Sequence, residues 1–145
     1  MSMVLEDTIE IYASRDRVWQ VTVDVEAWPK WSPVMETIRR EDTGEFRLGS
    51  TALIKQKQMA ETRWTVTEID PGHRFTWQAR SLGIDMIATH IIVPGESAVT
   101  SILRIEMDGL LIKLLGPIMK ALVAKSLKVE NQGLKHYCES GQGAN

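Results

Sequence analysis

Residues 18–33 read Val-Trp-Gln-Val-Thr-Val-Asp-Val-Glu-Ala-Trp-Pro-Lys-Trp-Ser-Pro, and three of the five tryptophans of the chain lie in this stretch. Large aromatic rings so close together need an apolar body to pack against or a ligand to enclose. Ser14 is a candidate helix N-cap just before the stretch, and Asp16 suits the first turn of a helix. Because Pro29 and Pro33 prevent a long helix, we expect two short helices that lead into a strand.

The segments on both sides of this stretch alternate between apolar and polar residues, as strands do. Ile9 and Ile11 share one face of a strand predicted over residues 4–12. After residue 34, alternating runs are separated by strong turn signals. These signals include Asp42-Thr-Gly44, Asp70-Pro71-Gly72, Leu82-Gly83 and Pro94-Gly95. Strands with this spacing predict one antiparallel sheet of six or seven strands.

The apolar period changes after Gly109 to the three- and four-residue spacing of an amphipathic helix, which continues to Tyr137. Pro117 is expected to start the main part of this helix or to kink its entry. The sheet and the helix each have one apolar face, and each must bury it against the other. Because a sheet of this size twists and curls, we expect an α+β fold in which the sheet wraps around the long C-terminal helix.

The composition is that of one ordinary globular domain. The chain has 145 residues, 43% of them hydrophobic and 25% charged, with a net charge of −2. We expect one domain over residues 1–140 and a flexible tail over residues 141–145. The single cysteine, Cys138, cannot form an intrachain disulfide and is expected to be a packing residue.

The charge and hydropathy patterns exclude several classes of protein. Lys and Arg are scattered, whereas a nucleic-acid binder would have a basic stripe. No apolar run approaches the roughly 20 residues that a membrane span needs, and the N-terminus does not have the pattern of a signal peptide. These features predict a cytoplasmic protein with no nucleic-acid partner and no stable membrane insertion.

A series of short motifs runs through the chain from about Ile9 to about Tyr137. In order, they are Val18-Trp19, Asp24, Trp28-Pro29, Trp31-Ser32-Pro33, Gly49-Ser50, Trp64-Thr65-Val66, Glu68-Ile69-Asp70-Pro71-Gly72, Phe75-Thr76-Trp77, and His90 on the strand before Pro94. Together they resemble the polyketide cyclase/dehydrase and lipid-transport family of the START/Bet v 1-like superfamily (SRPBCC), whose fold is called helix-grip. The motifs are mostly structural, so they indicate the fold more specifically than the function.

The resemblance implies a cavity between the curled sheet and the long helix. Members of the family bind lipids, polyketides, sterols and other bulky apolar molecules, and a minority catalyse cyclisation, dehydration or hydrolysis. The resemblance implies neither a nucleotide nor a metal cofactor. It therefore leaves a binding protein and an enzyme open.

A set of mainly apolar side chains is expected to face this cavity. Seven methionines and several tryptophans suit an adaptable apolar pocket. Plain core packing is the alternative role for each member of the set. The candidate ligand-binding residues are Trp31, Met35, Ile54, Gln56, Trp64, Phe75, Trp77, Met86, Ala88, His90, Ile105, Met107, Leu111, Leu115, Met119 and Leu122.

His90 is the candidate catalytic residue. Its ordinary pKa lies near neutrality, so it can act as a general acid or base. It faces the cavity if Met86 and Ala88 do, because side chains alternate along a strand. A lone histidine is more often a hydrogen-bonded core residue. The three histidines lack ligand spacing, so no metal site is expected.

Some polar residues also have more than one interpretation. Gln56, Arg63 and Glu68 are candidate polar groups of the cavity, but Arg63 and Glu68 fall on opposite faces of one strand unless a bulge intervenes. Trp31 either seals the underside of the fold or lines the cavity mouth.

Several hypotheses stay open, including a structural or stress-associated partner protein. The leading hypothesis is binding or transport of a hydrophobic small molecule such as a lipid or polyketide-like compound; the alternative is a cyclase/dehydrase-type enzyme that uses His90. The lysine-edged long helix also allows contact with a membrane surface. Apolar strands with few edge charges leave a homodimer open.

Overall fold

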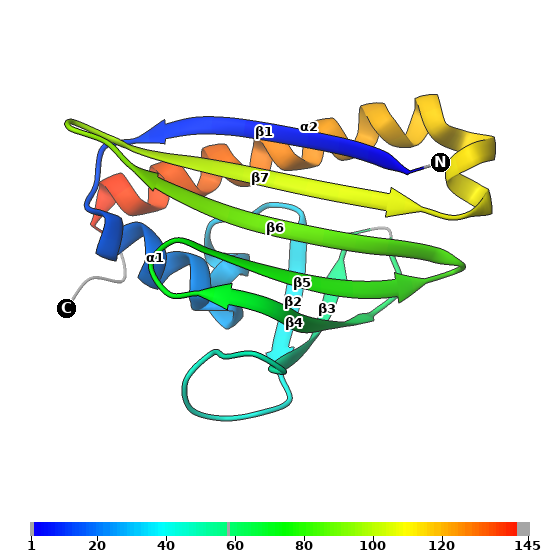
Figure 1. Cartoon of the computed structure of the whole chain (residues 1–145), viewed down its shortest axis with the longest axis horizontal. Helices are drawn as coiled ribbons and strands as arrows, with labels where there is room; N and C mark the ends of the chain where they lie inside the picture. Colours follow the sequence, from blue (N-terminus) through cyan, green and yellow to red (C-terminus); the bar gives the residue numbers. More distant parts are fainter. Residues whose placement is uncertain (1, 58, 142–145) are drawn as a thin grey trace.

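The computed structural model describes residues 2–57 and 59–141. The elements follow one another in the predicted order (Figure 1). They are β1 (Met3–Ile11), α1 (Arg15–Val23), the 3-10 helix η1 (Val25–Lys30), β2 (Met35–Arg40), β3 (Thr51–Gln56), β4 (Thr62–Asp70), β5 (Arg74–Ser81), β6 (Ile84–Pro94), β7 (Val99–Asp108) and α2 (Leu110–Ser140). Of the predicted tail, Gly141 is the left-handed C-cap of α2, and residues 142–145 lie outside the described residues.

The two short helices form where the tryptophan-rich stretch predicted them. Ser14 caps α1, because its Oγ accepts a hydrogen bond from the backbone N–H of Arg17 at 3.1 Å. The indole N–H of Trp28 in η1 donates to the backbone oxygen of Thr22 at 3.1 Å, which ties η1 to the end of α1. Pro29 lies inside η1, where the chain turns toward β2.

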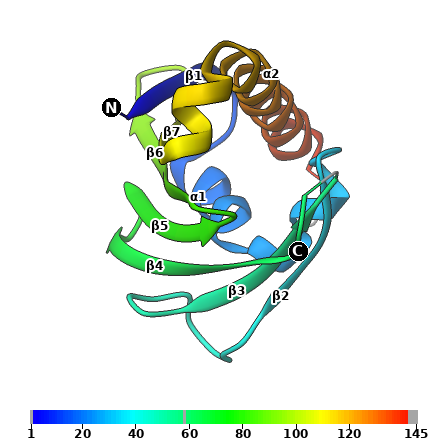
Figure 2. The same ribbon diagram turned by 90° about the vertical axis from the view of Figure 1, so that its right-hand side faces the viewer.

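All seven strands belong to one antiparallel sheet with the order β1-β7-β6-β5-β4-β3-β2. The register shifts between Met35 and Thr37 in β2 and between Val66 and Glu68 in β4. Such irregularities bend a strand and increase its twist. Figure 2 shows the result, a strongly curved sheet with α2 on its concave side.

The long helix α2 is kinked near its start. Leu115 has non-helical angles of φ −112° and ψ 16°, two residues before Pro117. This confirms the predicted effect of Pro117, whose ring clashes with the carbonyl of the preceding turn. Beyond the kink α2 runs along β1 and β7, and its last turns also meet α1.

The second half of α2 is attached to the fold by polar contacts and by close backbone packing. Asn131 is fully buried, and its side chain hydrogen-bonds to Ser101 in β7 and to Asp7 in β1. A Cβ atom at Gly133 would lie only 2.1 Å from the backbone oxygen of Trp31. At this point the helix and the loop after η1 therefore approach each other more closely than any side chain would allow.

Candidate functional site

The concave face of the sheet is built from rows of side chains that cross neighbouring strands. One row pairs Phe75 of β5 with His90 of β6, and His90 with Leu103 of β7. The next row pairs Trp77 with Ala88, and Ala88 with Ile105. Because side chains on one face pack against these cross-strand neighbours, the rows place aromatic rings over β4 and β5 and aliphatic chains over β6 and β7.

Aromatic rings fill the part of the concave face over β4 and β5. The ring of Trp77 lies 5.3 Å from Phe75, 5.7 Å from Trp64 and 5.4 Å from Trp28, measured between centroids. Phe46, from the loop between β2 and β3, adds an edge-to-face contact with Phe75 at 5.1 Å. All five rings are buried, so this part of the interior is a packed aromatic floor.

His90 is part of this floor. Its ring is stacked on Phe75, with centroids 4.6 Å apart and planes 11° apart, and it lies 5.1 Å from the ring of Trp28. Burial lowers the pKa of His90 to about 3, because the apolar surroundings disfavour the charged imidazolium. The imidazole is therefore neutral at physiological pH and packs as an aromatic ring.

The middle of the concave face over β6 and β7 is less well covered. Ala88 and Ile105 pair with each other across the two strands and are only half-buried. The residues two places along each strand, Met86 and His90 in β6 and Leu103 and Met107 in β7, are buried. Ala88 and Ile105 thus form an apolar region that solvent can reach, and buried side chains flank this region along both strands.

The predicted site residues fall into three groups. Eight are buried on the concave side: Met35, Ile54, Trp64, Phe75, Trp77, Met86, His90 and Met107. Five are half-buried: Trp31, Gln56, Ala88, Ile105 and Met119. Three are exposed: Leu111, Leu115 and Leu122.

The prediction that the sheet buries the whole apolar stripe of the helix is wrong for the exposed group. From the first half of α2, Ile112, Met119 and Val123 pack against the core. Leu111, Leu115 and Leu122 lie on other faces of the helix. Two features account for this: the kink redirects the first turns, and α2 follows β1 and β7 rather than β3 to β5.

Arg63 and Glu68, which were candidate polar groups of the predicted cavity, do not face the concave side of the sheet. Both are exposed on the outer side of β4, because the irregularity after Val66 puts them on the same face. Arg63 forms a two-bond ion pair with Glu41, and Glu68 pairs with Arg74. The Arg63 guanidinium lowers the pKa of Glu41 to about 2.

Several buried polar groups lie near the helix and the Trp31 loop, and of these residues sequence reasoning had named only Trp31 as a candidate. The indole N–H of Trp31 and the hydroxyl of Ser32 are buried, and neither has a hydrogen-bond partner among the described residues. Glu130 in α2 is buried as well, and burial raises its pKa to about 7. A signal for Glu130 existed, since it is three residues from Leu127 and four from Leu134 on the buried stripe of the helix.

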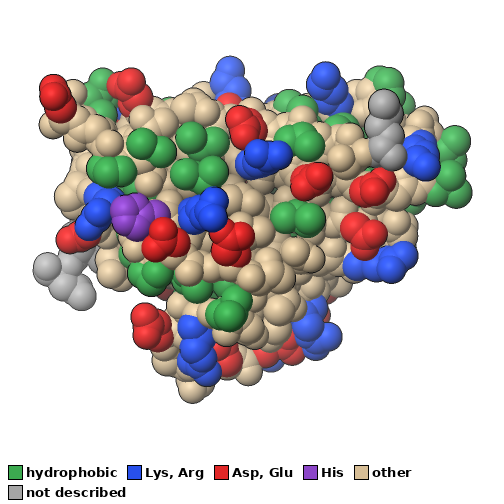
Figure 3. Space-filling model, in the orientation of Figure 1, with side chains coloured by type: hydrophobic (Ala, Val, Ile, Leu, Met, Phe, Trp, Pro, Cys, Tyr) green, Lys and Arg blue, Asp and Glu red, His purple; other side chains and the backbone are tan. Residues whose placement is uncertain are grey.

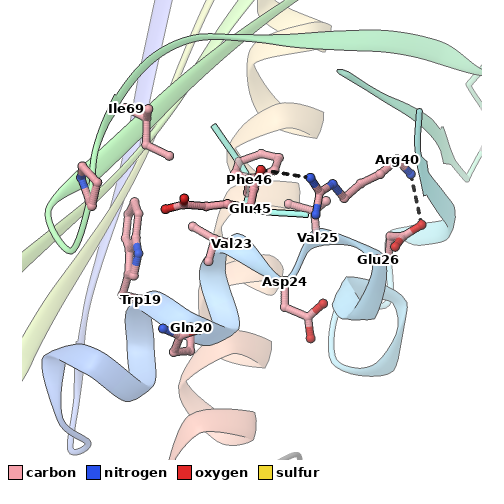
Figure 4. A pocket seen from close by; sticks show the side chains of 11 residues that line it. Trp19, Gln20, Val23, Asp24, Val25, Glu26, Arg40, Glu45, Phe46 and Ile69 are labelled. Carbon is pink, nitrogen blue, oxygen red and sulfur yellow. Dashed lines mark hydrogen bonds between the residues drawn. The ribbon is translucent and has the colours of Figure 1, made fainter. Parts of the chain in front are cut away.

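A separate cavity of about 300 Å³ lies beside α1 and η1 (Figure 4). Its apolar lining includes Trp19, Val23, Phe46 and Ile69. Arg40 spans its rim, where its guanidinium donates to the backbone oxygen of Gly44 at 2.8 Å. Several carboxylates also line the cavity. Arg40 is the one cationic side chain among the described residues that line it, and its guanidinium is already hydrogen-bonded within the protein, so it is not free to bind a ligand.

The described residues offer no group of three or more His, Cys, Asp and Glu side chains that could hold a metal ion. Within residues 2–57 and 59–141, no helix is long and apolar enough to cross a membrane.

Cys138, as predicted, is buried in the core, and burial raises the pKa of its thiol to about 11.

Comparisons with known proteins agree with this architecture. A family model described as polyketide cyclase/dehydrase and lipid transport matches residues 3–139. No curated protein sequence matches the chain significantly.

Solved structures share the fold at low sequence identity. A START superfamily protein from Mycobacterium smegmatis is 17% identical, with a TM-score of 0.81 over 94% of this chain and 97% of that chain. The Zhui aromatase/cyclase from Streptomyces sp. R1128 is 15% identical, with a TM-score of 0.81 over 99% and 98% of the two chains. Norcoclaurine synthase from Thalictrum flavum, in complex with dopamine and hydroxybenzaldehyde, is 19% identical, with a TM-score of 0.65 over 94% and 88%. These likenesses establish the helix-grip fold.

Proposed function

The chain belongs to the polyketide cyclase/dehydrase and lipid transport family, and on that premise we propose that it binds a bulky hydrophobic small molecule between the concave face of the sheet and α2. The ligand would rest on the aromatic floor and cover the half-buried residues of β6 and β7. Lipids and polyketide-like compounds have the size and apolar character that this surface suits.

One observation carries the proposal: Ala88 and Ile105 are reachable by solvent although buried residues flank them along both strands. Apolar surface of this kind gains about 25 cal/mol for each Å² that a ligand removes from water. Half-buried Met119 of α2 packs against the same core as these two residues, and it can adapt to ligands of different shape because its side chain is unbranched.

The alternative is an enzyme of the cyclase/dehydrase type in the same place. Two proteins with the same fold are named as enzymes, an aromatase/cyclase and a synthase that holds dopamine and hydroxybenzaldehyde. For this chain, the surroundings of His90 favour binding over acid–base catalysis. An imidazole with a pKa of about 3, stacked on Phe75 and packed beside the tilted ring of Trp28, is a weak base and is not protonated near neutral pH.

The first test is direct. Protein purified under native conditions is extracted with organic solvent, and the extract is analysed by mass spectrometry for co-purified apolar compounds. The same protein is titrated with a fluorescent fatty-acid probe, whose emission reports transfer from water to an apolar site. We expect saturable binding with one probe per chain.

Matched variants then locate the site. Ala88→Phe fills the uncovered part of the concave face and should weaken probe binding at least about tenfold, the equivalent of roughly 1.4 kcal/mol. Ile87→Phe is the control, since Ile87 is the next residue of β6 and points to the convex face. Wild-type affinity in a folded Ala88→Phe variant would rule out this site.

A further inference from the structure

The first half of α2 presents a large apolar surface to solvent. Leu110 is 70% exposed, Leu114 68%, Ile118 62% and Leu122 60%, and Leu111 and Leu115 are exposed too. These six residues are half of all the exposed large hydrophobic residues in the described part of the chain. Contiguous apolar patches of this kind mark interaction sites, whereas single exposed apolar residues are normal.

The patch is not a by-product of packing against the sheet. Leu110, Leu114, Ile118 and Leu122 follow one another at four-residue intervals, so they form a stripe along the helix. The face that packs against the core is a different one, which carries Ile112, Met119 and Val123. The fold therefore does not need the exposed stripe to be apolar.

The turn between β5 and β6 adds another apolar residue at the same end of the molecule. Leu82 is 80% exposed and has a positive φ of 53°, a conformation that is unfavourable for a bulky side chain. The next residue, Gly83, lies against Gly109, the N-cap of α2. The two backbones are so close that a Cβ atom added at Gly109 would be 2.4 Å from the Gly83 oxygen. Figure 3 shows hydrophobic side chains gathered at this right-hand end of the molecule, where α2 begins.

The charge of the same segment is strongly positive. Residues 109–129 contain Lys113, Lys120, Lys125 and Lys128 and no Asp or Glu, although the whole chain has a net charge of −2. All four lysines are exposed, and none forms an ion pair with a described residue. The segment thus combines an apolar stripe with local cationic charge.

We propose that residues 110–122 of α2, together with Leu82, bind the surface of an anionic lipid bilayer. The leucines and Ile118 enter the boundary between head groups and acyl chains, and the lysines contact anionic head groups. A second copy of the chain is a poorer occupant, because two such faces would place like charges against each other. Binding at the interface requires no helix that spans the membrane, in agreement with the helices of the described residues.

This proposal does not depend on a ligand in the concave face, but it places the bilayer beside that face. Met119 follows Leu115 by four residues and packs against the core. The apolar surface of α2 therefore continues from the proposed bilayer contact toward the uncovered part of the concave face.

The experiment is co-sedimentation of the full chain with vesicles of phosphatidylcholine alone and of phosphatidylcholine mixed with phosphatidylserine. We expect binding to the mixed vesicles, weaker binding at high salt because exposed charges are screened, and little binding to phosphatidylcholine alone. The double variant Leu114→Ser/Ile118→Ser should reduce the partition constant at least about tenfold. Lys120→Glu/Lys125→Glu should remove the preference for phosphatidylserine.

Leu48→Ser is the matched control, since Leu48 is 64% exposed but lies in the loop between β2 and β3. It should bind vesicles like the wild type, and circular dichroism should show that all variants are folded. Failure of the wild type to bind the mixed vesicles, or equal binding by the double serine variant, would overturn the proposal. So would a concentration-dependent dimer in analytical ultracentrifugation that the double serine variant abolishes, because the patch would then be covered by a second copy.

Discussion

The side-chain amide of Asn131 in α2 donates to Asp7 in β1 twice, to the carboxylate at 2.9 Å and to the backbone oxygen at 3.0 Å. The amide oxygen of Asn131 accepts a hydrogen bond from the hydroxyl of Ser101 in β7 at 2.9 Å. One fully buried side chain therefore connects the helix to two strands. This network fixes the second half of α2 and leaves the first half attached mainly through Ile112, Met119 and Val123.

Replacing Asn131 should destabilise the fold strongly. Asn131→Ala leaves the Ser101 hydroxyl and the Asp7 groups without their partner inside the protein, and we expect a loss of about 2–4 kcal/mol in the free energy of unfolding. Urea denaturation followed by tryptophan fluorescence measures the loss. Gln132→Ala is the control, because Gln132 is the next residue of the helix and is exposed. Equal midpoints for the two variants would show that the network contributes little.

The close approach at Gly133 gives a second prediction. Gly133→Ala would push a methyl group against the Trp31 backbone oxygen, and either the helix or the loop must move. We expect destabilisation of more than about 2 kcal/mol. Gly116→Ala, in the same helix, has nothing within 4 Å of the added Cβ and should change the free energy of unfolding by no more than about 1 kcal/mol. A well-tolerated Gly133→Ala would mean that the helix and the loop do not meet as described.

Glu130 predicts a pH dependence of stability. Burial raises its pKa from 4.5 to about 7 in the folded protein, so the folded state binds more protons than the unfolded state between these values. The contribution of Glu130 to stability is present below pH 4.5 and is lost as pH rises through 7, by roughly 3 kcal/mol. Glu130→Gln should therefore be more stable than the wild type at pH 8 and similar to it at pH 4.5. Urea midpoints across this range test the prediction, and a constant difference between the two proteins would contradict it.

His90 predicts a dependence of opposite sign. Burial lowers its pKa from 6.5 to about 3, so the unfolded state binds more protons between these values and stability falls as pH falls below 6.5. By pH 4.5 the loss should be roughly 3 kcal/mol. His90→Phe keeps an aromatic ring against Phe75 and should abolish this loss in urea denaturation at pH 4.5.

The same variant separates the two candidate functions. A binding protein should retain its affinity for the fatty-acid probe when Phe replaces His90, because the ring is a neutral part of the floor. An enzyme with His90 as its acid–base group would lose turnover while the fold stays intact.

The order of elements could be predicted from local sequence. Alternation identified the strands, Ser14 identified the start of α1, and Pro117 identified the disturbance in α2. These signals act over a few residues, and the antiparallel pairing of successive strands from β2 to β7 follows from the turns between them. The pairing of β1 with β7 joins distant parts of the chain and was not predicted. The buried aromatic members of the concave set also followed from alternation, since Trp64, Phe75 and Trp77 keep the period of their strands.

The remaining features depend on contacts between distant residues. The spacing of Glu130 from Leu127 and Leu134 was a local signal for its burial, but nothing near Asn131 in the sequence shows that its side chain finds partners in β1 and β7. The exposure of Leu111, Leu115 and Leu122 depends on which strands the helix follows, and helical spacing alone does not determine this. The outward position of Glu68 depends on one irregularity in the pairing of β4 with β5.

The close backbone contact at Gly133 has a mechanical consequence. The helix is held near Gly133 by this contact and by the Asn131 network, and its start is tied to the sheet through Gly109, which follows β7 and lies against the Gly83 backbone. The kink at Leu115 lies between these two attachments. A guest of greater bulk would therefore be accommodated by bending of α2 at the kink, without separation of any pair of strands.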